Sequence, residues 1–149
     1  MVLCGKVYIM KTFISYRHTG EDQKSLEKLL VPIRSALQGV DVESYCTFFD
    51  EDEFQDKSFG PKDIMYHAFS IIDKSDFLFV VQTSDSKSEG MLMEVGYCIA
   101  KSIPVVVATR DSVAYTYMPD MADLSFRWKD PKDLAQQIAK TDFSKLLKN

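Results

Sequence analysis

Several patterns are absent or scarce in this sequence of 149 residues. It has only three cysteines, Cys4, Cys46 and Cys98, which lie far apart without the spacing of metal ligands. This argues against a disulfide scaffold and against a zinc site. No apolar run approaches the roughly 18 residues of a membrane span, and no signal-peptide pattern opens the chain. We therefore expect a cytoplasmic protein whose cysteines are small apolar residues.

Positive charge is also scarce. The chain carries 18 Lys and Arg against 22 Asp and Glu, a net charge of −4, with no basic cluster. Nucleic acid and an anionic membrane surface are therefore not expected as partners. The densest acidic run, residues 50–56, lacks the glycine and the ligand spacing of a calcium loop. We interpret this run as a solvated loop and expect no metal site.

Apolar and amphipathic segments alternate along the whole chain, and its length suits a single domain. Residues 1–9 form a possible N-terminal extension. The patterns predict strands over residues 12–16, 42–49, 77–81, 104–108 and 124–128. They predict helices over residues 22–37, 61–72 and 88–101, with a final helix capped by Asp130 that begins at Pro131.

Two of these strands, residues 77–81 and 104–108, are apolar at every position. Such runs are typical of central parallel strands that helices cover on both faces. We predict a flavodoxin-like α/β fold, an open parallel sheet of four to five strands in the order 2-1-3-4-5. Ligands of such sheets bind beyond the carboxyl ends of the strands, where the winding reverses. This places the predicted site at residues 17–21 and 83–90.

Glu94 does not fit its surroundings, because the predicted helix 88–101 is apolar nearly all round. Burying an unpaired carboxylate is costly, so Glu94 requires a cationic partner, such as Arg17, Arg110 or a lysine, a raised pKa, or a ligand cleft. Its side chain leans toward the turn that contains Gly90, where no side chain blocks a ligand. Glu94 is therefore a candidate for catalysis.

Three stretches, residues 75–81, 88–97 and 101–106, resemble the nucleoside 2-deoxyribosyltransferase family. In that family the glutamate of a Glu-x-Gly-Tyr stretch attacks the anomeric carbon of a deoxyribosyl group, and Glu94 occupies its place. Ser88 resembles the phosphate-contacting serine of the related deoxynucleoside monophosphate hydrolases. Since related transferases complete their sites across subunits, the resemblance also implies a homo-oligomer.

The N-terminal half differs from the transferases, because residues 13–18 and 49–53 resemble the Toll/interleukin-receptor (TIR) domain family. Enzymatic members of that family cleave the nicotinamide glycosidic bond of NAD, also with a glutamate on the corresponding helix. Both resemblances therefore imply cleavage of an N-glycosidic bond. A carboxylate suits this reaction because it stabilises an oxocarbenium-like transition state or bonds covalently to the anomeric carbon.

The acid that would protonate the leaving base is less clear in the sequence. The acidic residue of the transferases aligns with Ala68, and the neighbouring His67 is a possible acid. One helical position is a rotation of about 100°, so His67 is not a direct replacement, and a surface histidine is the alternative interpretation.

The remaining candidates lie in the loops around the predicted site. Arg17 or His18 is able to hold a phosphate or ribose oxygen, or belongs to a simple polar turn. The candidate substrate-binding residues are Tyr16, Arg17, His18, Asp85, Ser88 and Gly90. A capping role explains Ser88 almost equally well. In the late loop, Tyr115, Tyr117, Met118 and Met121 either stack on a base or pack on the sheet edge.

The sequence thus supports three hypotheses. The first is an enzyme that transfers or hydrolyses the N-glycosidic bond of a nucleoside or nucleotide through Glu94, without a cofactor. The second is a TIR-like NAD glycohydrolase or cyclase in signalling or defence. The third is a non-catalytic nucleotide-sensing module, which the absence of an acid at Ala68 favours.

Overall fold

The computed structural model describes residues 2–3, 6–50 and 58–147, and its centre is a parallel sheet. The order is β4-β3-β5-β6-β7, formed by β3 (Met10–Tyr16), β4 (Val42–Tyr45), β5 (Phe77–Gln82), β6 (Val105–Arg110) and β7 (Leu124–Trp128). All four pairings in this sheet are parallel. The predicted order 2-1-3-4-5 is confirmed, and the switch point lies between β3 and β5.

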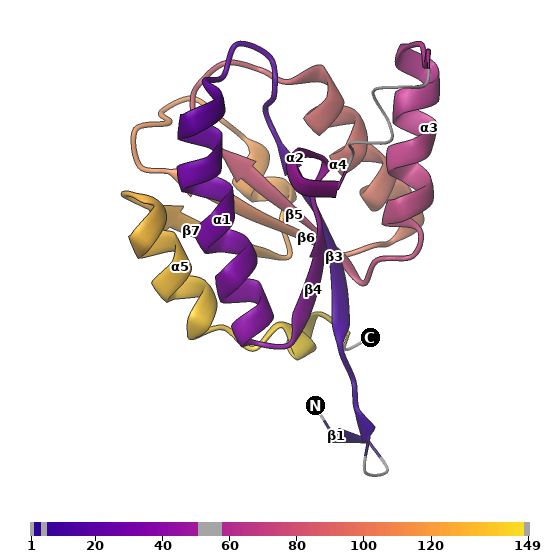
Figure 1. Ribbon diagram of the computed structural model, residues 1–149, viewed down its shortest axis with the longest axis vertical. Helices are drawn as coiled ribbons and strands as arrows, with labels where there is room; N and C mark the ends of the chain where they lie inside the picture. The colour runs from indigo at the N-terminus through magenta and orange to yellow at the C-terminus, as the bar shows by residue number, and fades with distance from the viewer. Residues whose placement is uncertain (1, 4–5, 51–57, 148–149) are drawn as a thin grey trace.

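Helices cover both faces of this sheet, as predicted (Figure 1). On one face α1 (Gln23–Gly39) and α5 (Pro131–Ala139) enclose the larger apolar core. On the other face α3 (Pro61–Ile72) and α4 (Glu89–Lys101) enclose a second core. Every residue of β5 from Phe77 to Val81 is buried, because this strand contributes side chains to both cores.

The helix boundaries follow the capping signals of the sequence. The carboxylate of Asp22 accepts a hydrogen bond from Ser25 N at the start of α1, and that of Asp130 accepts one from Asp133 N at the start of α5. The apolar stripe of α1 is buried throughout: Leu26, Leu29, Leu30, Ile33 and Leu37. The 3.6-residue period therefore identifies the buried face of α1 correctly.

The predicted strand 42–49 is wrong in its second half. The strand β4 ends at Tyr45, and a short helix, α2 (Thr47–Asp50), follows it. Two hydrogen bonds between Cys46 and Asp50 hold this turn. Cys46 N donates to the Asp50 carboxylate over 2.9 Å, and Asp50 N donates to Cys46 O over 2.9 Å. A local hydrogen-bonding side chain has overridden the apolar pattern of the segment.

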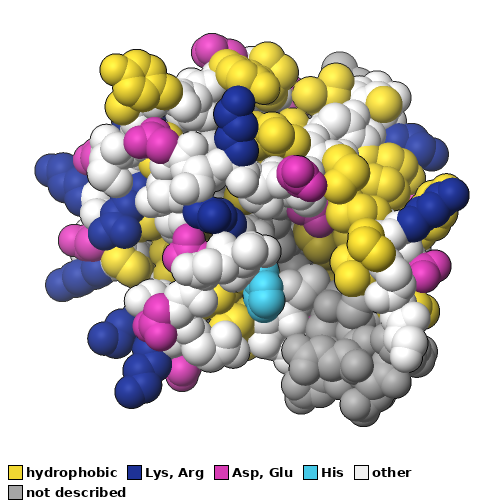
Figure 2. Space-filling model, turned by 90° about the horizontal axis from the view of Figure 1, so that it is seen from above, with side chains coloured by type: hydrophobic (Ala, Val, Ile, Leu, Met, Phe, Trp, Pro, Cys, Tyr) yellow, Lys and Arg dark blue, Asp and Glu magenta, His cyan; other side chains and the backbone are white. Residues whose placement is uncertain are grey.

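Several large apolar side chains of α3 and α4 are exposed to solvent. The helical spacing of Ile64, Ala68, Phe69 and Ile72 predicts that all four lie on the apolar side of α3. Ile64 is instead 46% exposed, so that prediction is wrong for it. On α4, Met91, Val95 and Cys98 are buried, whereas Met93 and Ile99 are exposed. Figure 2 shows hydrophobic side chains gathered on the side where these two helices lie. The predicted homo-oligomer stays a prediction, and an apolar surface of this kind is compatible with it.

Two short strands precede the sheet. The strands β1 (Val2–Leu3) and β2 (Lys6–Val7) pair only with each other, antiparallel and separate from the five-stranded sheet. The predictions for Cys4 and for residues 51–56 lie outside the described residues. Within the described ranges, no helix is long and apolar enough to cross a membrane. The same ranges hold no group of three or more acidic, histidine or cysteine residues suited to a metal ion.

Candidate functional site

Glu94 lies at the switch point of the sheet. Its Oε1 accepts a hydrogen bond of 2.6 Å from Ser15 Oγ, which belongs to the carboxyl-terminal part of β3. Ser15 is only 1% exposed, whereas Glu94 is half-buried on α4. A short hydrogen bond from a buried, ordered strand fixes the direction of the carboxylate. The Ser15 hydroxyl is a partner of Glu94 that the sequence did not indicate.

Cys98, one helical turn after Glu94, does not compete with it as a nucleophile. Burial raises the pKa of the Cys98 thiol to about 12, and the charges of Glu94 and Asp73 add to the rise. Burial also raises the pKa of Cys46 to about 12. Both thiols therefore remain protonated at neutral pH, and the thiolate is the reactive form. This agrees with the prediction of inert, core-forming cysteines at these two positions.

We expect Cys46 and Cys98 to resist alkylation in the folded protein. At pH 8 a thiol with a pKa near 12 holds about a thousandfold less thiolate than an ordinary cysteine, and burial blocks access as well. Peptide mass spectrometry after iodoacetamide treatment measures each site separately. Treatment in denaturant is the control, where both sites should react. Rapid labelling of Cys98 without denaturant would contradict the buried environment.

The surface beside Gly90 is open. A Cβ built at Gly90 would meet no heavy atom within 4 Å, and the same holds for Gly96 on the same helix. Since neither position demands glycine for packing, helix formation alone does not explain them. The predicted role of Gly90, leaving room for a ligand near Glu94, is compatible with this space. Gly96, which lies beyond Glu94 on α4, provides a matched comparison.

We expect Gly90→Ala and Gly96→Ala to have separable effects. Each should stabilise the protein by up to about 1 kcal/mol, because alanine loses less backbone entropy than glycine in a helix. Thermal unfolding measures this gain. If Gly90 clears the approach to Glu94, only Gly90→Ala should also raise KM for the substrate. Equal KM values in the two variants would show that Gly90 has no such role.

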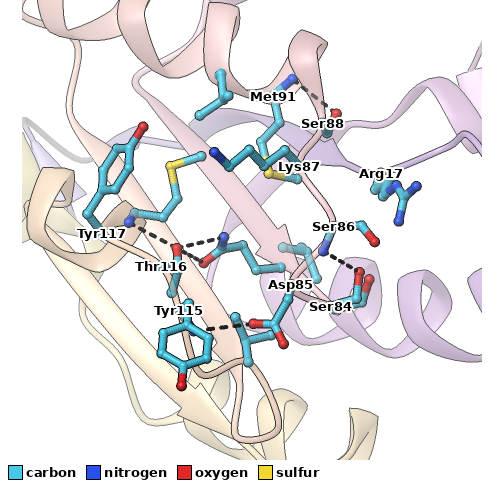
Figure 3. Close-up of a pocket in the computed structure, with 16 residues that line it drawn as sticks. Arg17, Ser84, Asp85, Ser86, Lys87, Ser88, Met91, Tyr115, Thr116 and Tyr117 are labelled. Carbon is cyan, nitrogen blue, oxygen red and sulfur yellow. Dashed lines mark hydrogen bonds between the residues drawn. The ribbon is translucent and has the colours of Figure 1, made fainter.

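A cavity lies between the loops that follow β5 and β6 (Figure 3). It is lined by Arg17, residues 81–88, Met91, Leu92, Val113 and residues 115–118. Its empty volume is about 590 Å³, part of which is open to solvent. Neither Glu94 nor Ser15 lines it, whereas Arg17, two residues after Ser15, does.

The structure brings together some of the predicted binding residues. Arg17 and Ser88 line the cavity, whereas His18 is exposed and does not. Ser88 caps α4, since its Oγ accepts a hydrogen bond from Met91 N over 3.3 Å. Tyr16 has its hydroxyl 2.9 Å from Thr47 Oγ1, on the side of β4. Residues from both predicted loops, 17–21 and 83–90, thus line one cavity, whereas Tyr16 does not line it and contacts Thr47 instead.

Asp85 holds the neighbouring loop. Its Oδ1 accepts hydrogen bonds from the backbone amides of Ala114, at 2.9 Å, and of Tyr115, at 3.3 Å. These contacts join the loop after β5 to the loop after β6 at the rim of the cavity. The carboxylate is thereby engaged in shaping the site, which sequence spacing did not indicate. Met121 lies apart from this cavity and lines a separate hollow near Ile103.

His67, the possible acid, lies against Tyr45 at the end of β4. Its Nε2 is 3.5 Å from the Tyr45 hydroxyl, and the two rings meet edge to face with centroids 6.5 Å apart. Ala68 is buried in the core beneath α3. An acidic side chain at position 68 would therefore point into apolar surroundings, whereas His67 is half-buried beside Tyr45.

The residue of the candidate site that the sequence missed is Ser15. The available signal is a hydroxyl near the end of β3, just before the switch-point loop. Thr12 carries a similar hydroxyl on the same strand, but donates to Phe77 O over 2.8 Å as a purely structural contact. Sequence alone does not separate these two roles.

No family model and no curated protein matches this sequence. Solved structures do share its fold. A conserved protein from Enterococcus faecalis V583 superposes with a TM-score of 0.67 and 18% identity, over 88% of this chain and 98% of that one. A 2-deoxyribosyltransferase from Bacillus psychrosaccharolyticus gives 0.66 and 16%, over 91% and 95%. The CMP N-glycosidase BcmB from Clostridium botulinum gives 0.63 and 13%, over 86% and 96%.

The chain is therefore structurally similar to a 2-deoxyribosyltransferase and to a CMP N-glycosidase over nearly the full length of each. Both of these proteins act on N-glycosidic bonds. At identities of 13–18% the likeness establishes the fold, and the chemistry of this chain has to be argued from its own residues.

Proposed function

We propose that this protein cleaves or transfers at the N-glycosidic bond of a nucleoside or nucleotide, with Glu94 as the carboxylate that acts on the anomeric carbon. The observation that carries the proposal is the hydrogen bond from Ser15 to Glu94 at the switch point. A half-buried carboxylate that a buried hydroxyl orients at the switch point of the sheet is the arrangement that such a reaction needs. The similarity to two N-glycosidic enzymes supports the same reaction class.

The proposed reaction has two steps, the formation and the breakdown of a covalent bond between Glu94 and the sugar. An oxygen of Glu94 bonds to the anomeric carbon while the bond to the base nitrogen breaks, and its electron pair leaves with the base, which takes up a proton. Water or a second base then attacks the anomeric carbon, the bond to Glu94 breaks, and the attacking group loses a proton. With Oε1 accepting from Ser15, we assign the attack to Oε2. Neither a metal nor a cofactor is required.

His67 is our candidate for the proton donor to the base. It is half-buried on α3, and its contact with Tyr45 orients the ring. If His67 does not donate a proton to the leaving base, the site binds a nucleotide without turnover, and the protein acts as a sensor. The buried Ala68, which leaves this part of α3 without a carboxylate, is the observation that favours this second function.

Incubation with deoxynucleosides, deoxynucleoside monophosphates and NAD, each with and without an acceptor base, distinguishes these functions by product. A free base with a free sugar indicates hydrolysis, and a new nucleoside indicates transfer. Release of nicotinamide indicates the NAD reaction. Tight binding without any product supports the sensor and contradicts the catalytic proposal.

A further inference from the structure

His67 and Glu94 lie on neighbouring helices at a similar level. The helices α3 and α4 lie side by side (Figure 1) and run parallel, because each returns the chain between two parallel strands. Tyr97 joins them, since its ring stacks on Phe69 with centroids 4.1 Å apart and its hydroxyl donates to Asp73 over 2.6 Å. His67 precedes Phe69 by two residues, and Glu94 precedes Tyr97 by three. At a rise of about 1.5 Å per residue, both side chains are displaced by a similar distance toward the carboxyl ends of the strands.

The strands place Tyr45 and Ser15 on the face of the sheet that these helices cover. Tyr45 on β4 is opposite Phe13 on β3, and Ser15 follows Phe13 by two residues. Side chains two residues apart on a strand share a face, and Phe13 and Tyr45 pack into the core beneath α3 and α4. Tyr45 and Ser15 therefore face the two helices that carry His67 and Glu94.

The Tyr45 side chain is held on one side and contacts His67 on the other. Its ring stacks on Phe13 with centroids 5.9 Å apart, which restrains the ring plane. Its hydroxyl lies 3.5 Å from His67 Nε2, the outer limit of a hydrogen bond. Hydrogen bonds of catalytic groups are often long in the free enzyme and tighten in the complex. The Tyr45 hydroxyl is therefore a fixed point against which the imidazole orients.

We propose that Tyr45 is a positioning residue, which acts through His67 and directs the transfer of a proton to the leaving base. The proposal rests on the proposed reaction at Glu94. As the bond between the anomeric carbon and the base nitrogen breaks, its electron pair leaves with the base, and a proton moves from the His67 imidazolium to the base. In the second step the neutral imidazole takes up the proton that the attacking water or second base loses. Tyr45 keeps its own proton throughout.

The test compares a leaving group that needs a proton with one that does not. Guanine leaves 2′-deoxyguanosine 5′-monophosphate as an anion unless an acid protonates it. The N7-methylated form of this nucleotide carries a positive charge on the base, which therefore leaves as a neutral molecule. For the ordinary nucleotide, His67→Gln should reduce kcat about a hundredfold, the size of a general-acid contribution. Tyr45→Phe should reduce it about three- to tenfold, the size of one hydrogen bond. Neither variant should slow the methylated nucleotide.

Tyr66→Phe is the matched control, because it removes a hydroxyl from the position before His67 on α3, where Tyr66 is 60% exposed. This variant should leave both rates unchanged. The double variant Tyr45→Phe/His67→Gln should be no slower than His67→Gln alone, because Tyr45 acts through the imidazole. Equal losses for the two nucleotides in Tyr45→Phe, or additive losses in the double variant, would overturn the proposal while leaving the reaction at Glu94 intact.

Nitrogen NMR of the imidazole rings tests the contact without turnover. The chain has only two histidines, His18 and His67, so His18→Gln assigns both sets of ring signals. In Tyr45→Phe the nitrogen shifts of His67 should move toward the tautomer mixture of a free imidazole, while those of His18 stay in place. Unchanged His67 signals would overturn the proposal. If the parent cleaves neither nucleotide, the proposed function fails for these substrates, whereas the contact still stands or falls by the His67 signals.

Discussion

Glu94→Gln is expected to abolish turnover while leaving the fold and substrate binding intact. Glutamine has nearly the same shape, and its side-chain oxygen is still able to accept the hydrogen bond from Ser15. What it loses is the negative charge that stabilises an oxocarbenium-like transition state or bonds to the anomeric carbon. Removal of a catalytic nucleophile costs a factor of about a thousand or more in kcat.

Rates with the cleaved substrate measure this loss, and thermal unfolding checks the fold. Glu89→Gln is the matched control, because Glu89 is an exposed carboxylate in the first turn of the same helix. It should retain activity and lose at most about 1 kcal/mol from a weaker interaction with the helix dipole. If Glu94→Gln turned over as fast as the parent, the assignment of Glu94 would be wrong.

Covalent capture distinguishes the two ways in which Glu94 acts. Acid quenching of the parent during turnover should leave a fraction of the protein with a sugar attached to a peptide of α4, if the carboxylate is a nucleophile. The same quench of Glu94→Gln should give no adduct. A fully active parent that never carries the adduct indicates electrostatic stabilisation by the carboxylate instead.

Ser15→Ala is expected to reduce kcat by about tenfold or more and to change KM little. Ser15 donates over 2.6 Å to Glu94 Oε1, and a hydrogen bond to a charged group contributes roughly 1.5–3 kcal/mol. Without it the carboxylate samples other orientations, and fewer of them align with the anomeric carbon. Ser15 is thus a positioning residue, and its effect should appear in kcat rather than in binding.

Thr12→Val is the matched control for this prediction. Thr12 is 1% exposed on the same strand, and its hydroxyl donates to Phe77 O rather than to Glu94. This variant should lose stability without a comparable loss of kcat. The double variant Ser15→Ala/Glu94→Gln should be no slower than Glu94→Gln alone, because the hydrogen bond acts through Glu94. Additive losses, or an equal loss in Thr12→Val, would reduce Ser15 to a structural role.

Some parts of the fold follow from local patterns, and others do not. The leucine stripe of α1 and the apolar run of β5 were predictable, because one period of side chains identifies one buried face. The end of β4 was not, because Asp50 closes a turn on Cys46 within an apolar segment. Ile64 was wrong for a related reason: helical spacing identifies a face but not whether another element covers all of it.

The candidate site divides in the same way. The sequence identified Glu94, because a carboxylate within an apolar helix stands out, and the resemblance to deoxyribosyltransferases gave it a role. It did not identify Ser15 as the partner or the engagement of Asp85 with the loop after β6. Ser15 and Glu94 are 79 residues apart, and no local pattern encodes which of the hydroxyls of β3 faces α4.

By itself, the sequence determined the parallel sheet, because apolar runs without alternation identify strands that helices cover on both faces. The flavodoxin-like strand order, taken as the pattern for such a sheet, placed Glu94 near the switch point. Only the tertiary structure decided which group orients that carboxylate and which residues line the cavity between the loops after β5 and β6. Both depend on contacts between β3, α4 and the loops after β5 and β6. Such contacts follow from the packing of whole elements, and that packing joined Arg17 and Lys87 to Tyr115 and Tyr117 in one cavity.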